Sequence, residues 1–186
     1  MAIDEEYPVL EYLIMAQSSE DHSTALVLPE TFQAPHLRHL MLLGFALPIR
    51  SRLLATVVGL ITLSLYMDPS TYFQPSTLLQ WISLMPQLEM LLIASLFPVP
   101  LHRDVETQLM HTSITTYFTL PNLRWFAFQG GSAYLEAVVS RITTPLLEKF
   151  SIEFFKQITF SVPRLAQFMN CNKAPQVRQC QVRVFR

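Results

Sequence analysis

The sequence predicts an α/β fold, a stack of short repeats whose strands form one parallel sheet. Two observations predict it. An eight-residue pattern of proline and spaced apolar residues recurs along the chain, and several segments between the copies have apolar residues at helical spacing. Each copy is too small to bury its own apolar side, so the copies must stack to form a continuous core.

The repeated unit is Pro-x-Leu-x-x-Leu-x-Leu, with aliphatic, Phe or Cys substitutions. Its copies start 27, 23, 28, 35, 24 and 30 residues apart, and all but one keep the proline. These intervals bracket the period of leucine-rich repeats, roughly 20–29 residues, with two long insertions. We therefore expect one leucine-rich-repeat domain over residues 1–186, a horseshoe arc of about seven repeats. The copies begin at Pro8, Pro35, Val58, Pro86, Pro121, Pro145 and Pro175.

The end of each unit predicts a strand. Alternate residues of a strand face the same side, so both leucines of Leu-x-Leu point into the core. Proline at the first position removes an N–H before the ladder begins. Side by side, these strands form a parallel sheet on the concave face of the arc.

The segments that return the chain to the next strand lie on the convex face. Apolar spacing predicts helices over residues 76–85, 132–142 and 161–169, and a weaker one over 104–112. Ser132 is placed to cap the second of these, after the Gly130-Gly131 turn, and Pro163 falls in the first turn of the third. The first two returns are expected to be irregular.

Composition limits the function classes. Half of the residues are hydrophobic (51%), the mean hydropathy is +0.30, and the net charge of −1 gives no argument for nucleic acid. The two cysteines form no disulfide framework, and the acidic start lacks the features of a signal peptide, so an intracellular location is expected. Residues 53–67 are almost uncharged but too short to span a bilayer, and we expect a helix and a buried strand there.

Four segments carry a resemblance to a known family. They read RDVETQLMH at 103–111, LPNLRW at 120–125, ITTPLLEK at 142–149 and TFSVPRL at 159–165. The chain resembles the leucine-rich-repeat portion of fungal F-box proteins, which are substrate adaptors of ubiquitin ligases. The resemblance implies substrate capture through the repeats. The F-box itself is not present: Leu28-Pro29-Glu30 is similar to its start but leads into the second repeat strand. Binding of the ligase scaffold would require an F-box elsewhere.

The concave face is the candidate partner-binding surface. In each strand it receives the residue before the second leucine, the one between the second and third, and the one after the third. The first four strands present mainly apolar residues and the last three mainly polar ones. An exposed apolar patch rich in Tyr, Met and Trp is typical of a protein-binding site. The candidate binding residues are Tyr12, His39, Met41, Tyr66, Met90, Leu92, Trp125, Gln129 and Lys149.

Charge follows two further patterns. The residue after the first leucine alternates in sign at Glu89, Arg124, Glu148 and Arg178, which predicts a ladder of ion pairs between neighbouring strands. Seven acidic residues and no Lys or Arg precede Arg38, whereas six basic residues and no acidic one follow Glu153. Such a chain can associate head to tail, although solvation of the two ends is the simpler explanation.

No catalytic motif, cofactor site or metal-ligand spacing is evident, so we expect a binding protein and not an enzyme. His36 and His39 are three apart at a strand entry and point away from each other. Both end repeats lack polar caps, so the stack is apparently uncapped. Two alternatives remain open: a truncated or non-functional solenoid fragment, and a membrane-associated protein built from the apolar segments of residues 40–67.

Overall fold

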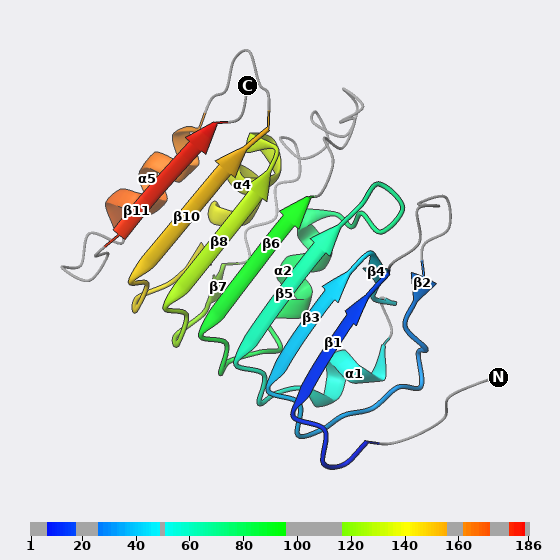
Figure 1. Cartoon of the computed structure of the whole chain (residues 1–186). Coiled ribbons are helices and arrows are strands. Elements are labelled where there is room, and N and C mark those ends of the chain that lie inside the picture. Colours follow the sequence, from blue (N-terminus) through cyan, green and yellow to red (C-terminus); the bar gives the residue numbers. More distant parts are fainter. Residues whose placement is uncertain are drawn as a thin grey trace.

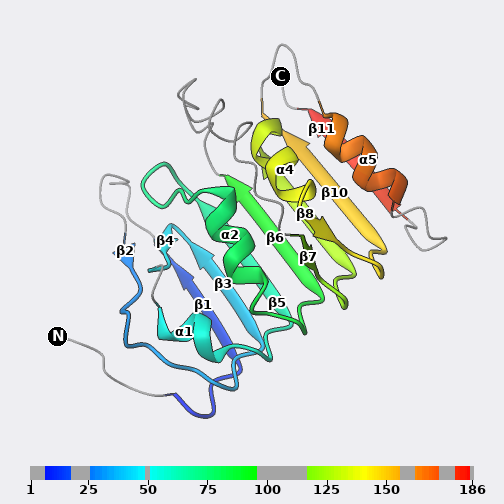
Figure 2. The same ribbon diagram turned by 180° about the vertical axis from the view of Figure 1, so that it is seen from behind.

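The computed structural model describes residues 7–17, 26–48, 51–95, 117–155, 162–171 and 179–184. It is a mixed α/β structure, in which a seven-stranded parallel sheet is covered by helices on one face (Figures 1 and 2). The strands lie side by side in chain order, so each crossover leads to the neighbouring strand. The sheet consists of β1 (Tyr12–Ala16), β3 (His39–Leu43), β5 (Thr62–Met67), β6 (Met90–Ser95), β8 (Trp125–Gly130), β10 (Lys149–Phe154) and β11 (Gln179–Val184).

The register of the sheet keeps equivalent repeat positions level. Leu40 pairs with Leu63, Leu63 with Leu91, and Leu91 with Phe126. The same row continues to Leu13 at one edge and Cys180 at the other. All seven copies of the sequence pattern therefore coincide with the seven strands. A shift of one residue in any strand would turn its core side chains to the opposite face.

Six of the seven strands are preceded by a β-turn within the described residues, and five of these turns hold the repeat proline. The amide N–H of Leu37 donates to the carbonyl of Ala34 (3.1 Å), which places Pro35 second in the turn, where its fixed φ is favourable. The same bond recurs at the start of all six copies that the structure describes. The proline thus shapes a turn ahead of the ladder, a different role from the predicted removal of an N–H at the strand entry.

The third copy has Val58 where the others have proline, and the local backbone explains why. Val57, the residue before it, ends a helix with φ −85° and ψ 45°, and its N–H still donates to the Leu53 carbonyl. A proline at position 58 would clash with this conformation, since the residue before a proline prefers an extended ψ.

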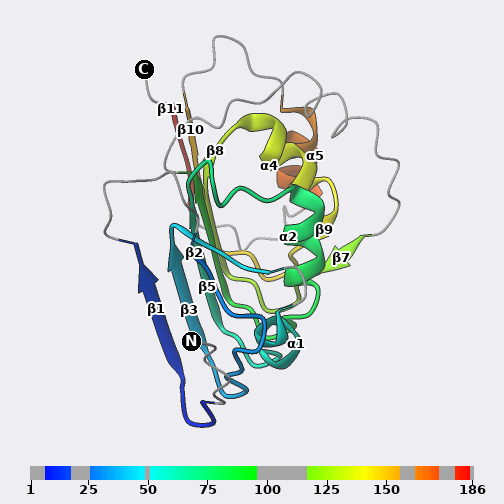
Figure 3. The same cartoon turned by 90° about the vertical axis from the view of Figure 1, so that its right-hand side faces the viewer.

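The helices lie on a single face of the sheet, as the view along it shows (Figure 3). Residues 76–85, 132–142 and 161–169 were predicted to be helical, and each range contains a helix. The predicted helix over 104–112 lies outside the described residues. The helices are α1 (Arg52–Thr56), α2 (Pro75–Ile82), α4 (Ser132–Val139) and α5 (Pro163–Cys171).

The predicted cap of α4 is wrong. Gly131, in an extended conformation, occupies the cap position, and Ser132 is already the first helical residue. Its side chain is buried. Gly130 ends β8, so Gly131 alone separates the strand from the helix, and Ser132 lies inside the helix instead of ahead of it.

In the described parts of the first two returns, α1 is the one helix. Short strands that the sequence did not predict appear in these and in later returns. β2 (Leu26–Val27) pairs with β4 (Phe45–Ala46), and β7 (Phe118–Thr119) pairs with β9 (Ile142–Thr143), both in parallel. The predicted helix and buried strand of residues 53–67 are present as α1 and β5. No helix in the described ranges is long and apolar enough to cross a membrane.

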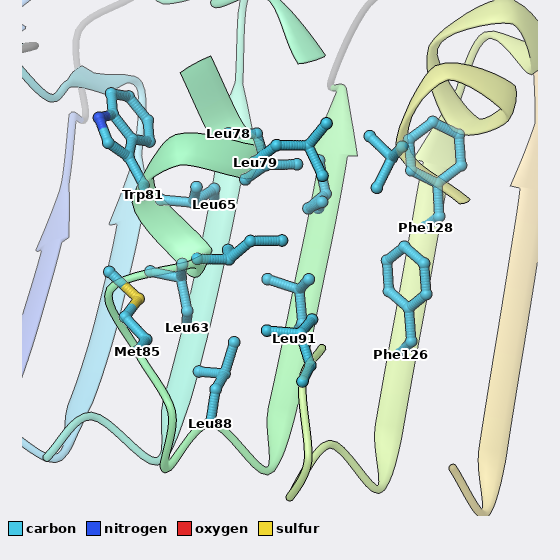
Figure 4. Close-up of a cluster of buried hydrophobic side chains, with 14 of the residues drawn as sticks. Leu63, Leu65, Leu78, Leu79, Trp81, Met85, Leu88, Leu91, Phe126 and Phe128 are labelled. Atoms are coloured by element: carbon cyan, nitrogen blue, oxygen red, sulfur yellow. The ribbon is translucent and has the colours of Figure 1, made fainter. Parts of the chain in front are cut away.

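The core fills the space between the sheet and its helices. Leu63, Leu91 and Phe126 are fully buried, and Leu78 and Leu79 of α2 point at them from the helical side (Figure 4). Burial of each such side chain contributes about 1.5–3 kcal/mol to stability relative to exposure. The helices therefore cover the core face of the interior strands, and the opposite face of the sheet is the one available for a binding site.

Candidate functional site

The face of the sheet opposite the helices, which we call the open face, is built from the alternate residues of the seven strands. Because the register is continuous, these residues form three rows that cross the sheet. The first row is Tyr12, His39, Thr62, Met90, Trp125, Lys149 and Gln179. The second is Ile14, Met41, Ser64, Leu92, Ala127, Ser151 and Gln181. The third is Ala16, Leu43, Tyr66, Ala94, Gln129, Glu153 and Arg183.

Contacts between side chains fix the first row at its β1 end. The rings of Tyr12 and His39 stack, with centroids 4.3 Å apart and planes 9° from parallel. His39 Nδ1 and Thr62 Oγ1 lie 3.1 Å apart in a hydrogen bond. Three neighbouring strands are thereby linked through their open-face side chains, and the exposed Tyr12 ring is held in one orientation against its neighbour.

The β1 end of the open face is apolar and largely exposed. Tyr12 is 63% exposed and Ile14 is 70% exposed. Met41, Met90 and Trp125 are half-buried, because each has a strand on both sides. Ser64 and Ala94 are small and buried between these larger side chains. A partner would meet aromatic, branched and thioether groups that are already ordered by the sheet.

The other end of the open face is polar. Gln129 and Glu153 are half-buried and Lys149 is exposed. The register of β11 brings Gln179 level with Lys149, and Arg183 level with Glu153. The open face therefore changes from apolar to polar and charged along the direction in which the strands stack.

All nine predicted binding residues lie in the three rows of the open face. Met90, Trp125 and Lys149 are level on neighbouring strands, and Met41 and Leu92 flank Ser64 in the second row. Tyr66 and Gln129 are both level with Ala94, one on each side. Ile14 also lies on the open face, although it is not one of the nine predicted binding residues. The alternation of side chains along the strand places it there, and its large exposure follows from the edge position of β1.

The predicted charge ladder forms in part. Arg124 Nη1 and Glu148 Oε1 make a salt bridge of 2.8 Å at the entry to β8 and β10, and both side chains are solvent-accessible. Arg178 lies outside the described residues. Among the ladder positions that the structure describes, this pair alone forms a salt bridge. An exposed pair of this kind contributes roughly 0–1 kcal/mol, so its role is to support strand register.

The groups with shifted pKa values lie away from the open face. Burial would raise the pKa of Asp68, but hydrogen bonds from Ser70 and Thr71 to its carboxylate outweigh that effect and hold the pKa below 3.8. These bonds close a buried turn after β5. Burial raises the pKa of Tyr134, in α4, well above 10.0, and the neighbouring Tyr72 adds to the effect. These are structural environments within the core.

No cluster of three or more His, Cys, Asp or Glu side chains within the described ranges is arranged to hold a metal ion. No protein-family model matches the chain, and comparisons with curated proteins and with solved structures found no significant match. The geometry of the open face is therefore the main indication of what the protein does.

Proposed function

We propose that the chain is a leucine-rich-repeat solenoid that recognises a protein partner through the open face of its sheet. The observation that carries this proposal is the exposure of ordered apolar side chains on that face, Tyr12 and Ile14 above all. On the other face of β1, Leu13 and Met15 are half-buried and pack against the core, so the exposure is greater on the open face. A contiguous apolar patch with a polar margin is typical of a protein-binding surface.

The repeat architecture supports the proposal independently of the patch. One copy of the pattern corresponds to one strand, and the register shifts by no residue over seven strands. Stacked repeats present a long, rigid sheet surface whose side chains change from strand to strand without a change in the backbone. Such a surface can match an extended partner that is apolar at one end and polar at the other.

The experiment that tests the proposal compares two sets of substitutions. In the first set, Tyr12, Met41, Met90 and Trp125 are each replaced by Ser. The matched control replaces Val58 and Leu84, which are exposed apolar residues outside the seven strands, by Ser. Partners are captured from cell extract by photo-crosslinking from position 90, with crosslinking from position 84 as the reference, and are identified by mass spectrometry.

We expect a partner that crosslinks from position 90 and not from 84. Its affinity should fall at least tenfold with the open-face substitutions and stay unchanged with the control pair. Circular dichroism confirms that each variant is folded. A partner retained equally by the two variants, or crosslinked equally from both positions, would contradict the proposal.

The resemblance to the repeats of F-box proteins extends this proposal to a substrate of a ubiquitin ligase. That extension is supported by the resemblance of four sequence segments alone. It predicts that ligase-scaffold subunits are recovered together with the partner, and that the partner accumulates when the protein is removed from cells. Unchanged partner turnover would leave protein recognition in place and remove the ligase step.

A further inference from the structure

The sheet ends in two edge strands, β1 and β11. β1 forms one edge and pairs only with β3 among the described strands. The N–H of His39 donates to the Glu11 carbonyl (3.0 Å), and the N–H of Gln17 donates to the Leu43 carbonyl (3.0 Å). The odd-numbered residues of β1 therefore bond to β3. By the alternation of a strand, the N–H and C=O groups of Tyr12, Ile14 and Ala16 point away from the sheet.

This edge has none of the features that usually protect an edge strand. The sequence of β1 is YLIMA, with no charge and no proline. Its side chains are accessible on both faces of the strand, in the burial pattern exposed, half-buried, exposed, half-buried, exposed. The equivalent core residues of β3, Leu40 and Leu42, are 1% exposed. A further strand beside β1 would bury apolar groups and satisfy a row of backbone donors and acceptors.

The opposite edge, β11, has the complementary set of groups. It pairs with β10 in parallel, with Gln179 level with Lys149. The same alternation directs the backbone of Gln179, Gln181 and Arg183 to β10 and that of Cys180, Val182 and Val184 outward. In a parallel sheet these outward groups match those of β1 when Gln179 lies level with Tyr12. That arrangement repeats the register found between all neighbouring strands of this sheet.

Charge selects this pairing over the pairing of two identical edges. The chain carries seven acidic and no Lys or Arg residues before Arg38, and six basic and no acidic residues after Glu153. Exposed Glu11 immediately precedes β1, and Arg183 lies within β11. By sequence, two β1 edges would bring acidic segments of two chains together, whereas β1 against β11 would join an acidic segment to a basic one.

We propose that a second copy of this chain docks its β11 edge in parallel against β1, so that the sheet continues from one copy into the next. The contact is heterologous: each copy contributes a different surface and retains one unused edge. Association of this type proceeds beyond dimers unless the geometry closes a ring. The surface is distinct from the open face proposed above for partner recognition.

Proline scanning of the two edges tests the pairing. Ile14→Pro removes an outward N–H of β1, and Val182→Pro removes one of β11, and proline is tolerated at edge positions of this kind. In sedimentation velocity at low salt, we expect the unmodified chain to increase in mass with concentration and each variant alone to remain a monomer. An equimolar mixture should reach twice the monomer mass and no more, because only one competent edge of each type remains.

Two results would overturn the proposal. One is a monomeric unmodified chain over the whole concentration range. The other is association of Val182→Pro with itself, which would indicate that two β1 edges pair. Circular dichroism reports whether each variant folds.

A second measurement needs no variant. Hydrogen exchange of the amides of Tyr12, Ile14 and Ala16 should slow as the concentration of the unmodified chain rises. The amides of β5, already bonded on both sides, provide the control and should not change. Association without protection of the three β1 amides would place the interface between copies elsewhere and contradict the proposal.

Discussion

The first strand and the interior strands of the sheet have the same repeat pattern but very different surroundings. In β5, β6 and β8 the core residues Leu63, Leu91 and Phe126 are completely buried. In β1 the equivalent Leu13 is only half-buried, and Tyr12 and Ile14 on the other face are largely exposed. Both regions keep the same register. The difference arises from the number of neighbours, since β1 has a strand on one side only.

This difference shows that the burial of a core residue depends on the neighbouring strands and not on the repeat sequence alone. A leucine at a consensus position contributes fully to stability only when both neighbouring strands and a helix cover it. Where one neighbour is missing, the same pattern leaves an accessible apolar strand. The edge is therefore expected to be less stable than the interior of the sheet.

Alanine substitution at equivalent positions should give the largest contrast. Leu91→Ala is expected to lower the free energy of unfolding by about 2–5 kcal/mol, because it leaves a cavity in a fully packed site. Leu13→Ala should cost roughly half of that or less, because its side chain is only partly removed from water. Urea unfolding followed by the fluorescence of buried Trp81 measures both. Equal losses would mean that β1 is packed as tightly as β6.

The turn after β3, which lies between the segments that follow β1 and β5, should be the next most sensitive site. Gly44 has φ +70°, and a β-carbon there would lie 3.3 Å from the Gln17 side chain. Gly44→Ala should destabilise by about 1–2 kcal/mol, since a side chain is strained in this conformation. Gly59→Ala is the control, because its β-carbon would have no neighbour within 4 Å. Thermal unfolding compares the two, and a neutral Gly44→Ala would argue against the left-handed turn.

Restoring the consensus proline in the third repeat should reduce stability. Val58→Pro is expected to cost on the order of 1 kcal/mol, because Val57 has ψ 45° at the end of α1. Pro86→Ala, in a repeat that keeps its proline, should also destabilise the protein by a few tenths to 1 kcal/mol, because it increases the conformational entropy of the unfolded chain. Thermal unfolding of both variants measures this. A more stable Val58→Pro would show that α1 does not constrain the turn.

The interior also contains buried polar groups. At neutral pH, substituting one of them should change stability less than the substitutions above. The Tyr134 hydroxyl is buried and has no hydrogen-bond partner among the described residues. Tyr134→Phe should therefore leave stability unchanged or raise it by about 1 kcal/mol. The structure stabilises the neutral phenol, because burial raises the folded-state pKa above 10.0.

Stability should thus be complete below pH 10 and fall as the pH rises above that value, where the unfolded tyrosine ionises and the folded one does not. Tyr134→Phe should reduce this alkaline loss, and Tyr72, whose pKa is also raised by burial, should account for part of the remainder. Urea unfolding at neutral pH and above pH 10 tests the difference. Identical pH dependence in the two proteins would exclude Tyr134 as a source.

The strands and their faces could be predicted from the sequence because a period of two residues fixes which side chains share a side. That rule placed all nine candidate residues on one face and needed no knowledge of the crossovers. The short pairs β2–β4 and β7–β9 could not be foreseen, since two-residue strands carry no periodic signal. The cap of α4 was misplaced because either Gly131 or Ser132 satisfies the pattern. The exposure of Ile14 depended on its neighbours, which a local pattern does not describe.

The in-register pairing has a consequence for how such a chain can change in evolution. Each strand of the sheet pairs only with its neighbours in chain order, and the six repeats whose starts are described begin with the same turn. Duplication or loss of one complete repeat would lengthen or shorten the sheet by one strand spacing, about 4.8 Å. The remaining rows would keep their alignment. An ancestor of different length could therefore have presented the same aromatic and methionine side chains in the same order.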